Sequence, residues 1–285
     1  MKILYNTTKT MDCDRRAPRG IRTTRPRFLK EAGQLVEQLQ ALDQGALSRA
    51  MSLSDTLART TRADLALWGK LKRPAGPAMG VFTGLVFKHL DAATLDADAW
   101  RFAQQHLVIL SGLYGLLRAG DRMEAYRLEM GCKFKPDGAA NLTAFWKPRV
   151  TEALNKLLKR GEPVLNLGAG EYLKAVDQTQ LKGPVIWPVF KERRDDGSLK
   201  VVTVYAKEAR GLMARFILEQ QIGAPAQLMA FDGAGWEAAE ELPERGSGCS
   251  CASVRRDVIS SSGSSLARSQ PGRQHPCDLR RAPSS

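Results

Sequence analysis

The spacing of apolar residues predicts one short strand at the start of the chain and a helix soon after it. The run KILY, residues 2–5, is typical of a short buried strand. A loop is expected from Arg15 to Arg27, because prolines and a glycine interrupt that segment. An amphipathic helix then follows from the apolar positions that recur at helical spacing: Leu29, Ala32, Leu35, Val36, Leu39 and Leu42.

Four further helical patterns continue to residue 160. Two short ones cover about 46–58 and 62–71, and the prolines and glycines of the following KRPAGPAMG predict a loop. The strongest pattern runs from Asp96 to Leu117, with interruptions at Ser111-Gly112 and at Gly115. Residues 142–160 predict a helix with Pro148 in its first turn, where the missing N–H of proline costs little.

After residue 161 the pattern changes to strands. PVLNLG and PVIWPVF are short apolar runs, KVVTVYA alternates, and Asp196-Gly197 favours a hairpin turn between the last two. A last helix is predicted from its core stripe: Ala209, Leu212, Met213, Phe216 and Ile217. Helices on both sides of several strands predict an α/β class fold, a single compact mixed domain with one central sheet flanked by helices, over residues 1–245.

Residues 246–285 differ in character from the rest. They lack apolar periodicity and are rich in Ser, Gly, Arg and Pro, so we expect a disordered tail. We hypothesise that this tail is out-of-frame translation, because its Gly-Ser-Gly-Cys-Ser-Cys can be encoded so that a neighbouring frame reads as an apolar strand. The Cys and His residues of the tail do not have the spacing of zinc sites, and we expect no metal site and no cofactor.

Composition narrows the function. With 43% hydrophobic and 26% charged residues and no long apolar run, the chain is expected to be a soluble, cytoplasmic monomer without a membrane span. Five cysteines without regular spacing are typical of reduced thiols. The net charge of +13 favours polyanionic partners such as nucleic acid, although solvated surface charge is the simpler explanation of a basic composition.

One short motif suggests how a phosphate could be held. Residues 110–115, Leu-Ser-Gly-Leu-Tyr-Gly, are interpreted as a helix, a glycine turn and a second helix, which would form a helix-hairpin-helix element. The backbone N–H groups of such a turn bind DNA phosphates without reading sequence, and Arg118 could add a charge-assisted bond. The alternative is a tight turn that serves packing alone.

Several longer motifs together resemble the YaaA family of peroxide-stress proteins, from residue 1 to about Trp236. They are Lys9-Thr10, FTGL at 82–85, FAQQHL, LSGLYGLLR, Asp121 and YRLEMG within 102–131, Asn166-Leu167 with Glu171, Tyr172 and Lys174, Phe190-Lys191, and AKEARGLMARF at 206–216. The resemblance implies a positively charged cleft bearing the helix-hairpin-helix element. It also implies DNA binding and a role in surviving hydroperoxide, linked to iron homeostasis through limiting free iron and the DNA damage that iron promotes.

DNA is therefore the expected partner, bound largely without sequence specificity. Tyr114 and Tyr126 could stack on unpaired bases, which would favour distorted or single-stranded DNA. The residues expected to contact DNA are Lys9, Ser111, Gly112, Tyr114, Gly115, Arg118, Tyr126, Arg127, Lys174, Lys207, Arg210 and Arg215.

Two other classes of function stay open. An enzyme acting on a nucleotide or nucleic-acid substrate could draw its acids, bases and phosphate anchors from two groups: Asp121, Tyr126, Arg127 and Glu129, and Glu171, Tyr172 and Lys174. Ion pairs that only hold loops in place would give the same pattern of charged residues. The other open class is an iron-handling adaptor that works through protein partners.

The stretch Gly168-Ala169-Gly170 follows a predicted strand, as a nucleotide-binding turn does. It lacks the third glycine of the dinucleotide fingerprint, since Leu173 stands in its place. A structural turn is the favoured interpretation.

Overall fold

A five-stranded sheet forms the centre of the computed structural model, which describes residues 1–70, 75–238 and 252–255. The strand order is β4-β3-β1-β6-β7, and all neighbours are parallel except the antiparallel β3–β4 pair. The strands are β1 (Lys2–Asn6), β3 (Leu107–Ser111), β4 (Gly115–Arg118), β6 (Val164–Asn166) and β7 (Val185–Ile186). The predicted α/β fold with one central sheet is confirmed.

Helices surround this sheet. The helix α9 packs closely on α5, and α6 and α7 contact β4. The bounds are α4 (Ala78–Val81), α5 (Leu85–Leu90), α6 (Ala97–His106), α7 (Leu142–Leu157), α8 (Gly170–Leu173) and α9 (Thr203–Glu219). Their inward faces join the strands in one hydrophobic core, whose largest fully buried side chains include Trp100, Trp146 and Tyr5.

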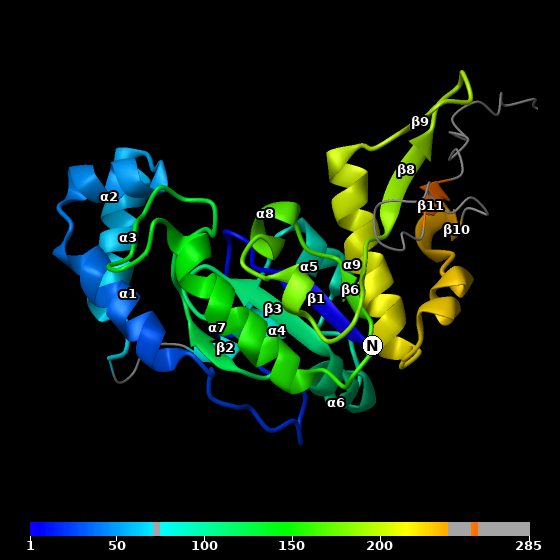
Figure 1. Ribbon diagram of the computed structural model, residues 1–285, viewed down its shortest axis with the longest axis horizontal. Helices are drawn as coiled ribbons and strands as arrows, with labels where there is room; N and C mark the ends of the chain where they lie inside the picture. Colours follow the sequence, from blue (N-terminus) through cyan, green and yellow to red (C-terminus); the bar gives the residue numbers. More distant parts are fainter. Residues whose placement is uncertain (71–74, 239–251, 256–285) are drawn as a thin grey trace, which may run out of the picture.

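Two smaller groups of elements lie at the ends of the long axis (Figure 1). One end holds α1 (Leu29–Ala41), α2 (Gln44–Met51) and α3 (Asp55–Leu67). The other end holds a four-stranded sheet in the order β10-β11-β8-β9, beside α9. Its strands are β8 (Val189–Arg193), β9 (Leu199–Lys200), β10 (Trp236–Ala238) and β11 (Ala252–Arg255).

The remaining elements are short. The strands β2 (Ala75–Pro77) and β5 (Arg122–Glu124) form a two-stranded sheet, and three 3-10 turns cover Gln178–Gln180, Pro225–Ala230 and Gly233–Gly235. The segment 75–80, expected to be a loop, therefore contains β2 and most of α4.

The predicted helix-hairpin-helix element at 110–115 is wrong. Asp96 caps α6, which ends at His106, and the next residues form β3 and β4, a β-hairpin in which Ser111 pairs with Gly115. The run LVILS is buried at every position, and such a continuous apolar run cannot be distinguished from a buried helix by periodicity alone. The segment from Asp96 to Leu117, predicted to be helical on both sides of a glycine turn, is therefore a helix followed by two strands.

Three other expectations need correction. Pro148 lies inside α7, past its first turn, because the side chain of Asn141 caps the helix by accepting a hydrogen bond from the Ala144 N–H. Of the predicted third strand KVVTVYA, residues 200–206, only Lys200 lies in a strand, because α9 begins at Thr203 and packs on α5. In the tail, 252–255 form β11, paired with β8 and β10, and the other residues from 246 onward lie outside the described residues.

Candidate functional site

A cavity of about 350 Å³ lies beyond the carboxyl ends of the central strands β1 and β6. We call it the basic cavity. Five segments that are distant in the sequence form its walls: the loop after β1, the start of α5, the segment after β5, the turn after β6, and α9. Its lining residues are Asn6–Met11, Gly84–Val86, Tyr126–Glu129, Leu167, Ala169, Glu171, Tyr172, Lys207 and Arg210.

The topology of the sheet explains why the cavity forms there. Parallel strands β1 and β6 are neighbours, and they end at Asn6 and Asn166. The chain leaves β1 toward β3 on one side, whereas β6 and β7 lie on the other side. In open α/β sheets the loops diverge at such a reversal of strand order, and the crevice that they leave beyond the carboxyl ends of the strands is where ligands bind.

Hydrogen bonds fix the rim of the basic cavity. The side-chain oxygen of Asn6 accepts from the Ala169 N–H at 2.7 Å, which ties the end of β1 to the turn after β6. The hydroxyl of Thr8 accepts from the Gly84 N–H at 3.2 Å and so joins the loop after β1 to the start of α5. These bonds hold three walls of the cavity in place.

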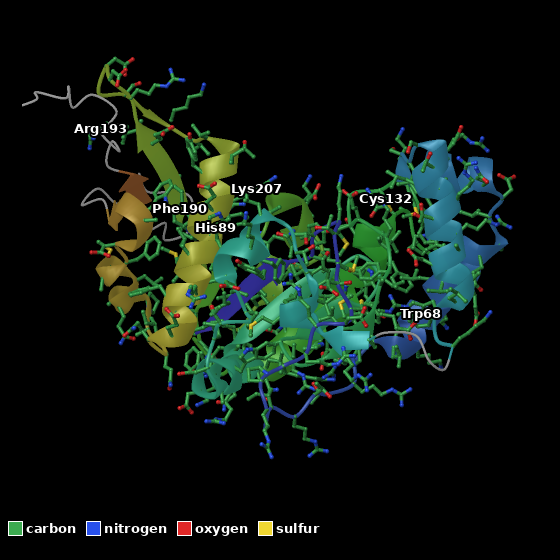
Figure 2. All side chains as sticks on the ribbon, turned by 180° about the vertical axis from the view of Figure 1, so that it is seen from behind. Trp68, His89, Cys132, Phe190, Arg193 and Lys207 are labelled. Atoms are coloured by element: carbon green, nitrogen blue, oxygen red, sulfur yellow. The ribbon has the colours of Figure 1, made fainter. Side chains whose placement is uncertain are left out.

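Two cations reach the basic cavity from α9. Lys207 and Arg210 are three residues apart and so share a face of the helix. Gly211 allows α9 to approach α5 closely, since a Cβ there would lie 2.4 Å from the carbonyl oxygen of Val86. In Figure 2, Lys207 extends from α9 toward the middle of the molecule, and Cys132 lies across from it, on the side of the α1–α3 group.

A third cation, Arg127, enters from the segment after β5. Its Nε is buried and has no hydrogen-bond partner among the described residues. Neither Arg127 nor the two cations of α9 forms an ion pair within the described part of the chain. Burial lowers the pKa of Arg210, although an arginine stays charged under any ordinary condition. The basic cavity therefore holds three positive charges without carboxylate partners.

Two carboxylates also line the basic cavity, at Glu129 and Glu171. The carboxylate of Glu129 accepts from the ammonium of Lys9 at 3.1 Å, in a pair whose side chains are 36% and 60% exposed. Solvent screens such a pair, so it contributes at most about 1 kcal/mol. Lys9 therefore stays available to a ligand that competes with Glu129.

Two buried phenols, those of Tyr126 and Tyr172, line the basic cavity. The hydroxyls of Ser111 and Tyr126 are 2.7 Å apart, and the hydroxyl of Thr7 donates to that of Tyr172 at 3.2 Å. Burial raises the pKa of Tyr172 to about 12 and raises that of Tyr126 well above its ordinary value of 10.0. Both phenols are protonated at neutral pH and can donate a hydrogen bond to a ligand, but they are poor proton acceptors.

The hairpin residues predicted to hold a phosphate are instead part of the core. A Cβ on Gly112 would lie 2.2 Å from the carbonyl oxygen of Leu128, and one on Gly115 would lie 2.5 Å from the Trp146 ring. Ser111 is fully buried and binds the N–H of Tyr114. These positions serve packing, which was the alternative interpretation of the motif.

The predicted stacking role of the tyrosines is wrong for this conformation. The ring of Tyr114 is 1% exposed, and its hydroxyl accepts from the Trp68 indole and from the Glu124 N–H. Tyr126 is 4% exposed and packs edge-on against Tyr114. Neither ring offers a free face to a base, because both are enclosed by protein.

Two predicted contacts lie away from the basic cavity and are already paired. Arg118 contacts Asp121, whose carboxylate is 1% exposed and also accepts from the Thr24 hydroxyl and the Arg118 N–H. Arg215 pairs with Glu219 at 2.7 Å and donates to carbonyls at the end of α5. Asp121 is therefore separated from the acid and tyrosine cluster proposed for an enzyme.

Lys174 lies beside a second, more open cavity of about 590 Å³, which it shares with Cys132, Lys147 and Glu171. Glu171 lines both cavities, so they adjoin. Burial raises the pKa of the Cys132 thiol, which makes it less reactive at neutral pH.

Sequence reasoning missed the polar residues that follow β1, namely Asn6, Thr7 and Thr8. The available signal was their position directly after the first predicted strand, because loops at the carboxyl ends of parallel strands form ligand sites. Among the residues that the structure describes, no group of three or more His, Cys, Asp or Glu side chains is placed to hold a metal ion. No helix within them has the length and apolar composition needed to cross a membrane.

Fold and cavity together define an α/β protein with a cation-lined cavity at the carboxyl ends of its parallel strands. The chain belongs to the YaaA family, since the family described as peroxide stress protein YaaA matches residues 1–242. A UPF0246 protein of Ralstonia nicotianae is 42% identical over 249 residues, covering 86% of this chain and 96% of the relative. A UPF0246 protein of Paracidovorax citrulli is 41% identical over 240 residues, covering 83% and 92%.

Proposed function

We propose that this peroxide-stress family protein binds DNA through the phosphates that its basic cavity can accept, largely without sequence specificity. One observation carries the proposal: Arg127, Lys207 and Arg210 converge on one cavity without carboxylate partners in the described part of the chain. A buried donor left without a partner costs about 1–3 kcal/mol, so the unpaired Nε of Arg127 favours an anionic ligand. DNA binding would serve the peroxide-stress role, and its link to limiting free iron rests on the family resemblance.

The physical basis is electrostatic. A chain with a net charge of +13 attracts a polyanion at long range, and the cations of the basic cavity then form short contacts to phosphate oxygens. Arginine contributes most to this step, because its planar fork matches the geometry of a phosphate. Contacts of this kind position DNA but do not read its sequence.

The test compares two arginine variants by fluorescence anisotropy with a labelled DNA duplex and a labelled bubble. Arg127→Ala is expected to weaken binding about tenfold, the effect of losing a charge-assisted bond of about 1.4 kcal/mol. Arg160→Ala is the matched control. This exposed arginine precedes the amino end of β6, whereas the basic cavity lies at the carboxyl end. Equal affinities for the two variants would contradict the proposal.

An enzyme acting on a nucleotide or nucleic acid is the second candidate. It is favoured by one observation, namely that Glu129 and Glu171 line the same cavity as the cations. The tyrosines beside them are held protonated, so a carboxylate would have to accept any proton that the reaction releases. Turnover that Glu129→Gln or Glu171→Gln abolishes, with DNA binding retained, would establish this class.

A further inference from the structure

The size of the basic cavity limits what can enter it. Its volume of about 350 Å³ is at the lower end of the range of about 300–1,000 Å³ found for small-molecule sites. A DNA duplex, whose major groove alone is about 12 Å wide, cannot enter a space of this size, although its backbone phosphates can contact the exposed Lys207 and the half-buried Arg210 from outside. A single phosphorylated unit can enter it, so the interior must be complementary to something much smaller than a duplex.

The walls differ in chemistry. Arg127, Lys207 and Arg210 supply the positive charge, whereas the side chains of Leu85, Val86 and Leu167 supply apolar surface. A ligand that satisfies both walls carries an anionic group joined to a flat or apolar group. Inorganic phosphate would leave the apolar wall in contact with water, and a nucleoside without phosphate would leave the cations unpaired.

The turn after β6 shapes one wall of the basic cavity. Leu167, Gly168 and Ala169 connect β6 to the four-residue α8, and the side-chain oxygen of Asn166 accepts from the Gly168 N–H at 3.1 Å. Ala169 lines the basic cavity, and its N–H is held by Asn6 at the end of β1. The turn is therefore a wall of the cavity and not only a structural connection.

We propose that the basic cavity is a binding site for one nucleotide unit, with its phosphate on Arg127, Lys207 and Arg210 and its base against Leu85, Val86 and Leu167. This inference rests on the proposed function and deepens it. Two sources present the same chemistry: a free nucleoside monophosphate, and an unpaired nucleotide that leaves the stack of a DNA strand. Removing a base from the stack costs a few kcal/mol, and least where it is already unpaired.

The experiment uses the full chain and two ligand series. Calorimetry with dTMP and dAMP, inorganic phosphate, and thymidine measures the free-nucleotide source. A DNA bubble with one 2-aminopurine, whose fluorescence rises when it is unstacked, measures the strand source. We expect dTMP or dAMP to bind at least about tenfold more tightly than phosphate or thymidine, or the 2-aminopurine signal to rise on binding.

A matched pair of variants tests whether the ligand enters the cavity. Ala169 lines the basic cavity at a partly exposed position, so Ala169→Phe adds a large side chain there without changing the charge, and Ala169→Ser barely changes the volume. Ala169→Phe is expected to lower nucleotide affinity by about tenfold or more, and Ala169→Ser by less than about twofold.

The outcomes separate the two proposals. DNA binding that depends on Arg127, without mononucleotide binding and without a 2-aminopurine signal, would overturn this inference and leave the proposed function standing. Mononucleotide binding blocked by Ala169→Phe, without DNA binding, would support the site and assign it to free nucleotides. Nucleotide binding that ignores Ala169→Phe would overturn the placement in the basic cavity.

Discussion

Replacing Asp121 with alanine tests whether this acid serves structure or function. Its carboxylate is 1% exposed and accepts from the Thr24 hydroxyl at 2.5 Å, the Arg118 N–H at 2.9 Å and the Arg118 guanidinium at 3.4 Å. The backbone of Thr24 also bonds to Gly120 and Arg122. Asp121 therefore fastens the basic loop of residues 15–27 to the hairpin, and it does not line the basic cavity.

The magnitude follows from these contacts. A hydrogen bond to a charged group contributes about 1.5–3 kcal/mol, whereas the Arg118 guanidinium is 43% exposed and its pair contributes at most about 1 kcal/mol. The alanine also removes the cost of burying a charge, which offsets part of the loss. We expect the free energy of unfolding to fall by about 3 kcal/mol, and Tm by about 6–12 °C for a folded body of this size.

Thermal unfolding followed by circular dichroism measures this change, and DNA anisotropy at a temperature where both proteins are folded measures function. Asp121→Ala should be less stable than the wild type and bind DNA with the same affinity. A variant as stable as the wild type that no longer binds DNA would refute the reasoning, because Asp121 would then act on the ligand.

Three further predictions concern other sites. Gly112→Ala should lower the free energy of unfolding in urea by about 1–3 kcal/mol or more, because the new Cβ meets the Leu128 carbonyl. Glu129→Gln should leave DNA affinity unchanged or raise it, because it removes a negative charge from a site for phosphate. Stability should fall in two steps on acidification. Burial lowers the pKa of His106 below 6.5, so its contribution is complete above pH 6.5 and is lost as the pH falls from there. Burial acts to raise the pKa of Glu162, but hydrogen bonds from the Lys159 N–H and the terminal ammonium outweigh it, so this contribution is lost below about pH 4.5.

Each of these has a contradicting result. If Gly112→Ala leaves the stability unchanged but weakens DNA binding, the hairpin contacts DNA and does not serve packing alone. A large loss of DNA affinity in Glu129→Gln would place that carboxylate on the ligand. Tm measured from pH 7.5 to 3.5 should show a smaller acid step below pH 4.5 in Glu162→Gln than in the wild type, because other carboxylates with a lowered pKa, such as Asp43 and Asp177, still contribute. A step of unchanged size would contradict the contribution assigned to Glu162.

The sequence was sufficient where local periodicity decides the structure. β1, α1 and the apolar stripe of α9 were predicted because each buries one face of a regular element. The hairpin β3–β4 was not, because its apolar run continues directly from α6 and offers no period of its own. Its structure depends instead on packing against the carbonyl oxygen of Leu128 and the ring of Trp146. Both residues belong to other segments of the chain.

The site was only partly predictable for a related reason. Lys9, Arg127, Lys207 and Arg210 were expected to bind the ligand, and the structure brings all four to one cavity. Their convergence depends on strand order, which places β1 between β3 and β6 and cannot be derived from spacing along the chain. Arg215 has the same charge, but its local ion pairs remove it from this group.

The salt dependence of DNA binding tests the central claim most directly, through the slope of log affinity against log salt concentration. The variant with both Lys207→Ala and Arg210→Ala is compared with the wild type, using the same duplex and a folded sample of each. Each phosphate contact contributes about 0.9 to this slope, so the account predicts that the double variant binds more weakly with a slope smaller by about 1.8. An unchanged slope would contradict it, because the cations of the basic cavity would then make no contact with DNA phosphates.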